Sequence, residues 1–194
     1  MSPTTSITVA GLCGSLRDES YTRVALRIAL DAASESGAVT ELLDLRDFEL
    51  PVFRPDRDEP AAAAQLKRTL RESDAVILGS PMYHGSYSSP LKTALDYCGF
   101  DEFEHKTIGL LAVSGGQFPV SALDHLRSVC RALDAWVLPY QTAIPDSHSN
   151  FTNRKLVNDE LHNRVVTLGQ RIVRFAVIQE IDPASFESLE NKGA

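Results

Sequence analysis

The sequence predicts an α/β protein with a doubly wound parallel sheet. Five short apolar or β-branched segments alternate with segments of helical spacing, and strand–helix–strand crossovers of this kind return to one sheet. The segments 75–80 and 108–113 are continuous apolar runs, which are typical of strands buried on both faces. No repeat, low-complexity segment or linker interrupts the pattern. We therefore expect one domain over residues 1–194, with an ordered core of about 6–180.

Local signals give the expected bounds of the elements. Strands are predicted over 7–10, 39–45, 75–80, 108–113 and 135–138. Helices are predicted over 22–35, 60–72, 90–98 and 123–133, and from 158 onward. Ser36 and Gly37 are expected to end the first helix, Pro60 to be the first residue of the second, and Ser89 to cap the third. A polar loop is expected over 145–155, and fraying from residue 182.

Composition excludes several classes of partner. The net charge is −7 and the acidic residues are scattered, which argues against binding to nucleic acid or to an anionic membrane surface. No apolar run approaches the ~20 residues of a membrane span. The N-terminus lacks a secretory pattern, so a cytoplasmic location is expected. Three widely separated cysteines predict reduced thiols, and five histidines without ligand spacing predict no metal site.

A loop of hydrogen-bond donors follows the first predicted strand. It offers three hydroxyls and one guanidinium, from Ser15, Arg17, Ser20 and Thr22. The free amides and positive dipole end of a helix N-terminus favour an anion there, and arginine binds phosphate with a planar fork. The plainer interpretation is that Ser20 only caps the helix and that Arg17 is solvated.

Spacing excludes two common phosphate loops at this position. No Lys follows Gly14 as a P-loop requires, and the residues after Gly11 lack the glycines of the dinucleotide fingerprint. The donors are hydroxyls rather than crowded glycine amides. A terminal monophosphate is therefore favoured over a bridging pyrophosphate.

Two further loops follow the third and fourth predicted strands. One contains Pro81, Met82, Tyr83, His84, Gly85 and Ser86, and the other contains Ser114, Gly115, Gly116 and Gln117. Taken singly, each loop is explained by turn chemistry or by a packed aromatic ring. In a sheet of order 2-1-3-4-5, however, the carboxyl ends of strands one, three and four are neighbours. One ligand can then touch all three loops.

The three loops together suggest the shape of that ligand. They combine a phosphate site, an extended aromatic wall at Met82 and Tyr83, and glycines that let backbone amides approach a ring. A phosphate joined to a planar heteroaromatic ring describes flavin mononucleotide (FMN).

Three segments resemble the NADPH-dependent FMN reductase family, whose members have the flavodoxin-like three-layer α/β sandwich. They are Gly14-Ser-Leu-Arg-x-x-Ser-x-Thr22, Ser80-Pro-Met-Tyr-His-Gly-Ser-Tyr-Ser-Ser-Pro-Leu-Lys-Thr-Ala-Leu-Asp96 and Ser114-Gly-Gly-Gln117. The resemblance covers about residues 7–176 and implies a five-stranded parallel sheet of order 2-1-3-4-5.

The resemblance also implies roles for the site residues. The phosphate ligands would be Ser15, Arg17, Ser20 and Thr22. The isoalloxazine would be lined by Pro81, Met82, Tyr83 and His84, supported by Gly85 and Ser86, and reached by Ser114, Gly115, Gly116 and Gln117. Many members have Glu where Met82 stands and Asn where His84 stands, so the contacts at these two positions depart from the family pattern.

The implied function is hydride transfer from NADPH or NADH through FMN to a small-molecule acceptor, such as free flavin or a quinone. FMN carries this chemistry, so no catalytic side chain is expected. One alternative is a flavodoxin-like electron carrier without NAD(P)H turnover. Another is a hydrolase with Cys13 as nucleophile, which is disfavoured because Ser15 stands where the second elbow glycine belongs.

Partners are also implied by the resemblance. It predicts a homodimer or homotetramer that uses the helix after Pro90, with Tyr97 facing either a partner subunit or its own sheet. The segment 81–96 is most similar to reductases that supply reduced FMN to two-component monooxygenases. A monooxygenase is therefore a further expected partner.

Overall fold

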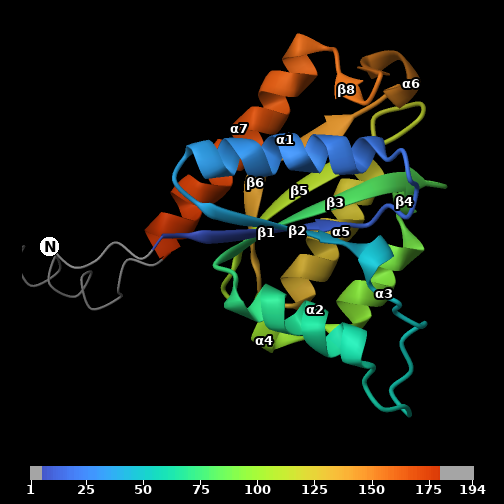
Figure 1. Ribbon diagram of the computed structural model, residues 1–194, viewed down its shortest axis with the longest axis vertical. Helices are drawn as coiled ribbons and strands as arrows, with labels where there is room; N and C mark the ends of the chain where they lie inside the picture. Colours follow the sequence, from blue (N-terminus) through green and yellow to red (C-terminus); the bar gives the residue numbers. More distant parts are fainter. Residues whose placement is uncertain (1–5, 180–194) are drawn as a thin grey trace, which may run out of the picture.

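The computed structural model describes residues 6–179 and contains a parallel sheet with helices on both faces (Figure 1). The five parallel strands are β1 (Thr8–Cys13), β2 (Val39–Asp44), β3 (Ala75–Tyr83), β5 (Thr107–Val113) and β6 (Trp136–Ile144). They lie in the order β2-β1-β3-β5-β6, which is 2-1-3-4-5 when only parallel strands are counted. The predicted fold class and strand order are confirmed.

Helices cover each face of the sheet over a separate hydrophobic core. One face carries α1 (Tyr21–Glu35) and α7 (Asp159–Gln179). The other carries α2 (Ala61–Glu72), α3 (Ser89–Tyr97), the short α4 (Phe100–Phe103) and α5 (Val120–Ala132). Figure 1 shows these two layers above and below the sheet. The sheet is therefore buried on both sides, as its continuous apolar strands require.

Small residues allow α1 and α7 to approach closely. A Cβ atom at Gly169 of α7 would lie 2.1 Å from the carbonyl oxygen of Ala29 in α1. A Cβ at Gly11 of β1 would similarly lie 2.7 Å from Cδ1 of Leu30. Gly169 is therefore required by packing against backbone, whereas a side chain at Gly11 would require the Leu30 side chain to move.

The third strand is longer than predicted and turns back on itself. It continues to Tyr83 and pairs with the antiparallel strand β4 (Ser86–Tyr87). The two turn residues, His84 and Gly85, have φ angles of 50° and 81°, as a two-residue type I′ hairpin requires. This short hairpin was not predicted, because only two residue pairs form it.

The last strand also extends beyond its predicted end at Leu138. The pairing with β5 shifts register between Ile108 and Leu110, which leaves Pro139 in an irregular part of the edge strand. Arg127 of α5 donates one hydrogen bond to the carbonyl of Leu138 (3.0 Å) and one to Gln141 Oε1 (2.8 Å). A bulge therefore accommodates Pro139 within the strand.

Capping residues set the starts of the helices. Ser20 caps α1 as predicted, since its hydroxyl accepts from the Arg23 amide at 3.1 Å. The prediction for α3 is wrong by one residue, because the N-cap is Ser88, which accepts from the Leu91 amide. Pro60 is the N-cap of α2 rather than its first residue.

The predicted polar loop over 145–155 contains short elements instead. They are α6 (Ser147–Asn150), β7 (Phe151–Thr152) and β8 (Lys155–Leu156), and the last two form a hairpin. Its turn residues, Asn153 and Arg154, both have positive φ. A 3-10 turn, η1 (Leu45–Asp47), similarly follows β2. Elements this short leave no periodic pattern in a sequence.

Among residues 6–179, no helix has the length and apolar character that crossing a bilayer requires. The fraying predicted from residue 182 falls outside the described residues.

The close approach of α1 and α7 makes a prediction about stability. Gly169→Ala is expected to lower the free energy of unfolding by roughly 1–3 kcal/mol or more, because the methyl meets backbone that has to shift. Thermal and urea unfolding measure this change. Gly116→Ala is the matched control, because open space surrounds a Cβ built there. Equal effects of the two substitutions would contradict the packing argument.

Candidate functional site

A cavity of about 280 Å³ lies at the carboxyl ends of the central strands. Its walls come from the loops after β1, β3, β5 and β6. The lining residues are Ser15, Arg17, Ser20, Tyr21, Thr22, Pro81, Met82, Tyr83, Val113, Ser114, Gly115, Ser147 and His148. Ligands of doubly wound sheets bind at this edge, where the strand order reverses.

Most of the predicted site residues converge on this cavity. Those that line it are Ser15, Arg17, Ser20, Thr22, Pro81, Met82, Tyr83, Ser114 and Gly115. Those outside its lining are His84, Gly85, Ser86, Gly116 and Gln117. Sequence reasoning missed Tyr21, Val113, Ser147 and His148, and the last two lie beyond the predicted end of the fifth strand.

Gly14 fixes the start of the first loop against its neighbours. Its amide donates to the carbonyl of Gly79 (2.8 Å), and its carbonyl accepts from the Ser88 hydroxyl (2.6 Å). A Cβ at this position would lie 2.8 Å from Cβ of Leu91. The loop after β1 is therefore held directly on β3 and on the start of α3.

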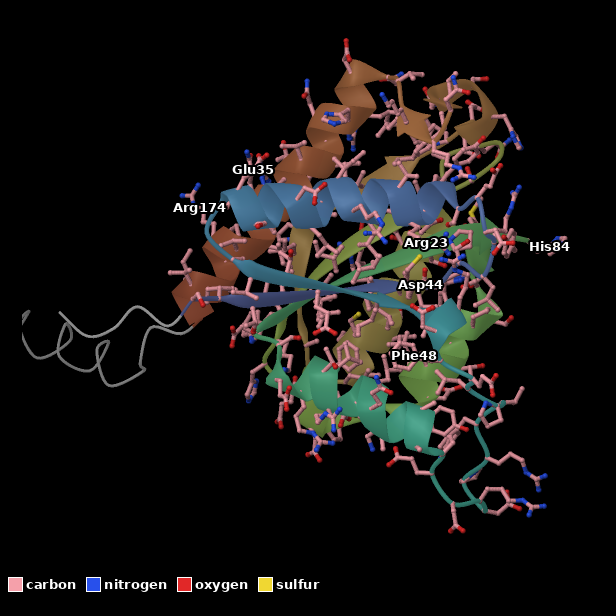
Figure 2. All side chains as sticks on the ribbon, viewed as in Figure 1. Arg23, Glu35, Asp44, Phe48, His84 and Arg174 are labelled. Atoms are coloured by element: carbon pink, nitrogen blue, oxygen red, sulfur yellow. The ribbon has the colours of Figure 1, made fainter. Side chains whose placement is uncertain are left out.

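Behind the first loop lies a buried ion pair. Arg23 Nε donates to Asp44 Oδ2 at 2.5 Å, and the side chains are only 9% and 6% exposed. Figure 2 shows the two residues together between the start of α1 and the end of β2. The remaining guanidinium nitrogens donate to the carbonyls of Ser15, Arg17 and Asp18 at 3.0–3.2 Å.

Arg46 extends this ion pair toward the solvent. Its guanidinium donates to both Asp44 oxygens and to Asp18 Oδ1. Burial raises the pKa of Asp44, but the hydrogen bonds from Arg46 and Arg23 outweigh that effect and hold its pKa below the ordinary value. Asp44 is therefore a carboxylate near neutral pH.

The first loop keeps several donors free for a ligand. Within residues 6–179, the hydroxyls of Ser15 and Thr22 donate to no other group. Arg17 is exposed and forms no ion pair there. Ser20 combines two roles, because its hydroxyl caps α1 and also borders the cavity.

The second loop presents the last residues of β3 to the cavity. Tyr83 is 51% exposed, while Met82 packs with its sulfur 3.6 Å from the Ser121 hydroxyl of α5. Beyond them His84 points away from the molecule at the tip of the hairpin (Figure 2). Ser86 contacts Nδ1 of His125 in α5 at 2.9 Å. The hairpin residues 84–86 thus support the wall formed by β3.

The third loop is tied to the segment that follows β6. The carbonyls of Ser114 and Gly116 accept from the amides of Ser147 (2.9 Å) and Asp146 (2.8 Å). These bonds place α6 beside the cavity. A Cβ built at Gly115 would lie 3.6 Å from Nε2 of His148, an ordinary van der Waals contact, so the imidazole lies beside this glycine.

An aromatic group borders the cavity on the α1 side. The rings of Tyr21 and Phe151 stack at 4.5 Å, and His148 meets Tyr21 edge-on at 6.4 Å. Arg154 of the β7–β8 hairpin pairs with Glu19 of the first loop at 2.5 Å. Residues far apart in sequence therefore close this side of the site.

The geometry argues against a thiol nucleophile. Cys13 is fully buried at the end of β1, and burial raises the pKa of its thiol. A nucleophilic cysteine requires the opposite, namely access and a lowered pKa.

The cavity and strand order define a flavodoxin-like fold, with a loop of hydroxyl and guanidinium donors beside the end of β3. Solved structures support the fold at low sequence identity. An NAD(P)H:(acceptor) oxidoreductase from Paracoccus denitrificans has a TM-score of 0.75 and 20% identity over 89% of this chain and 98% of its own. An apo NADH:FMN oxidoreductase has a TM-score of 0.73 and 20% identity over 92% and 93%.

Sequence comparison places the chain in a family. Residues 7–149 match the NADPH-dependent FMN reductase family, and the chain belongs to it. An FMN-dependent NADPH-azoreductase of Staphylococcus aureus is 30% identical over 92% of this chain and 97% of its own length. One from Staphylococcus saprophyticus is 39% identical over 57% of this chain, and that match spans 60% of the relative. The chain is an oxidoreductase that uses FMN with NAD(P)H as electron donor.

Because the pKa of Asp44 is lowered, we expect its contribution to the free energy of unfolding to depend on pH. A carboxyl whose pKa is depressed on folding stabilises the protein above its unfolded pKa of ~3.9 and loses that contribution as pH falls through the folded pKa. Asp44→Asn should therefore cost on the order of 2 kcal/mol of unfolding free energy between pH 6 and 8, and less below about pH 4.

Urea unfolding across this pH range measures the difference from the unsubstituted protein. Asp47→Asn serves as the control, because Asp47 is exposed and lies three residues after Asp44 in the sequence. A cost for Asp44→Asn that stays constant down to pH 2 would contradict the assignment.

The hairpin turn makes a prediction about His84. His84→Asn should raise stability by roughly 0.5 kcal/mol, because asparagine adopts positive φ readily, and should leave FMN affinity within about twofold. Thermal unfolding and FMN titration measure these effects. Gly85→Ala, at φ 81°, should instead lower stability by about 1 kcal/mol. A large loss of FMN affinity in His84→Asn would instead support the predicted contact between His84 and the ring.

Proposed function

We propose that the cavity at the strand ends binds FMN and that the enzyme passes hydride from NAD(P)H to a small aromatic acceptor there. The observation that carries this proposal is the convergence of Arg17, Tyr83 and Gly115 on one cavity from three separate loops. These residues supply the three features that the cofactor needs, namely a cation, an apolar wall and close backbone approach.

The first loop fits a phosphate dianion. Ser15 and Thr22 offer hydroxyls, and Arg17 offers a guanidinium that forms no ion pair within residues 6–179. The start of α1 adds unpaired amides and the positive dipole end. In this assignment Ser15, Arg17, Ser20 and Thr22 hold the phosphate.

The second and third loops fit the edges of a flat ring. Pro81, Met82 and Tyr83 form an extended wall at the end of β3. Ser114 and Gly115 lie beside it, because Val113 of β5 pairs with Pro81. We assign His84, Gly85 and Ser86 to support of this wall, and Gly116 and Gln117 to the outer part of the third loop. The cavity is small beside the ~300–1,000 Å³ of many ligand pockets, so one face of a bound ring is left open.

FMN, when bound, supplies the hydride-accepting and hydride-donating chemistry. The chain's own residues bind and orient it. The hydroxyls and Arg17 anchor one end, and the β3 wall fixes the plane of the other. An open face suits alternate stacking of a nicotinamide and an acceptor, and hydride transfer of this kind requires no nucleophilic side chain.

The acceptor class follows from the same open face. A planar, apolar or mildly polar aromatic compound, such as a free flavin, a quinone or an azo compound, stacks there without a shaped pocket. The similarity to staphylococcal azoreductases supports the azo option. Exposed apolar side chains at Leu16 and Tyr83 lie in the loops that form the site.

We further propose a cytoplasmic homodimer or homotetramer, with a monooxygenase as one recipient of reduced FMN. A cytoplasmic location supplies NAD(P)H and FMN. In this chain Tyr97 contacts the loop after η1, because its hydroxyl donates to Pro51 and its ring meets Phe53 edge-on at 5.2 Å. This contact leaves α3 and that loop as one surface for a second subunit. Light scattering measures the assembly.

The visible spectrum tests the proposed cofactor and activity together. The purified protein, titrated with FMN, should show bound oxidised flavin that bleaches on anaerobic addition of NADPH or NADH. Steady NAD(P)H oxidation with free FMN or an azo dye as acceptor should follow. Tight FMN binding without such turnover would instead indicate an electron carrier, and no FMN binding would refute the assignment.

Arg17→Ala tests the phosphate assignment. Loss of a charge-assisted contact of about 1.5–3 kcal/mol should weaken FMN roughly 10- to 100-fold and riboflavin hardly at all. Fluorescence titration of both flavins measures this. Arg57→Ala, at an exposed arginine in the loop after η1, is the control and should change neither affinity. Equal weakening of both flavins would argue against a phosphate role for Arg17.

A further inference from the structure

We propose that Arg23 is the positioning residue of the FMN phosphate loop, acting through the loop backbone and not by touching the phosphate. This inference rests on the proposed function, because it assigns a residue behind the same site. Arg23 does not line the cavity, and the sequence motifs gave it no role.

The first step is the depth at which Arg23 is buried. The residue is 7% exposed, and its guanidinium contacts only Asp44 and backbone carbonyls among the described residues. Asp44 Oδ1 also accepts from Arg23 Nη2 at 3.4 Å. A guanidinium desolvated this far is stable only where carboxylate and carbonyl oxygens accept its N–H groups.

The second step is the direction in which the loop peptides point. The carbonyls of Ser15, Arg17 and Asp18 all turn toward the guanidinium. In a planar trans peptide the N–H of the next residue points the opposite way. The amides of Leu16, Asp18 and Glu19 are therefore directed away from Arg23, and none of them donates to another group within residues 6–179.

The third step is electrostatic. Carbonyl oxygens repel a phosphate, whereas N–H groups attract it. By gathering three carbonyls on its own side, Arg23 keeps these acceptors away from the phosphate and directs the three N–H groups to the side of the loop remote from the ion pair. The neighbouring acids do not oppose this, because Asp18 is paired with Arg46 and Glu19 with Arg154.

Arginine is specifically suited to this task. Its planar fork donates to Asp44 and to three carbonyls at once, whereas a lysine ammonium has three donors around one point. Arg23→Lys therefore keeps the charge but releases part of the loop. Arg27→Lys is the matched control, since Arg27 lies one turn later on α1 and is exposed.

The test compares affinities for FMN and riboflavin in the two variants. The ratio of the riboflavin Kd to the FMN Kd reports the phosphate contribution alone. Arg23→Lys should lower this ratio at least about tenfold, and Arg27→Lys should leave it unchanged. A merely structural role would weaken both flavins equally or only lower the melting temperature, and either result in a folded variant would overturn the proposal.

Amide NMR of the unsubstituted protein decides the matter if Arg23→Lys does not fold. FMN and inorganic phosphate should both shift the amide resonances of Leu16, Asp18 and Glu19, and riboflavin should not. Absence of these shifts with FMN bound would refute the role of Arg23 while leaving the proposed function intact. Failure of the unsubstituted protein to bind FMN would refute both.

Discussion

The buried ion pair between Arg23 and Asp44 is the interaction on which the candidate site depends. It joins the first turn of α1, the end of β2 and the backbone of the loop after β1. Burying two charges is costly, and the cost is offset only when nearly every donor and acceptor is satisfied. Here the loop carbonyls and Arg46 complete that requirement, so the loop conformation and the ion pair stabilise each other.

Around this fixed loop, the sheet brings together segments that are distant in sequence. Parallel strands in the observed order end at one rim, so the loops after β1, β3 and β5 become neighbours. Gly14 and Ser88 join the first two loops directly, and the amides of Asp146 and Ser147 join the third to α6. The site is thus a set of mutually bonded loops on a rigid sheet, which suits a protein that orients a cofactor rather than one that attacks a substrate.

Several residues with a positive φ angle, which few side chains adopt readily, lie in the connections that shape this rim. His84 and Gly85 turn the β3–β4 hairpin, Asp146 precedes α6, and Asn153 with Arg154 turns the β7–β8 hairpin, all at positive φ. Such residues persist because surrounding bonds determine them. The ion pair between Arg154 and Glu19 is one of these bonds, and it joins the β7–β8 hairpin to the loop after β1.

Apolar periodicity and turn chemistry are local signals, so the sequence alone determined the fold class, while the strand order came from the resemblance to the reductase family. Of the predicted site residues, those that line the cavity are Ser15, Arg17, Ser20, Thr22, Pro81, Met82, Tyr83, Ser114 and Gly115. The sequence also determined the helix cap at Ser20. Only the tertiary structure revealed the positions of Arg23, Asp44 and His148 at the site. The same holds for the hairpin that carries His84 outward and for the continuation of β6 past Pro139. The reason is physical. A buried charge is identified by the residue it pairs with, and a bulge by the strand it pairs with, and these partners lie far away along the chain.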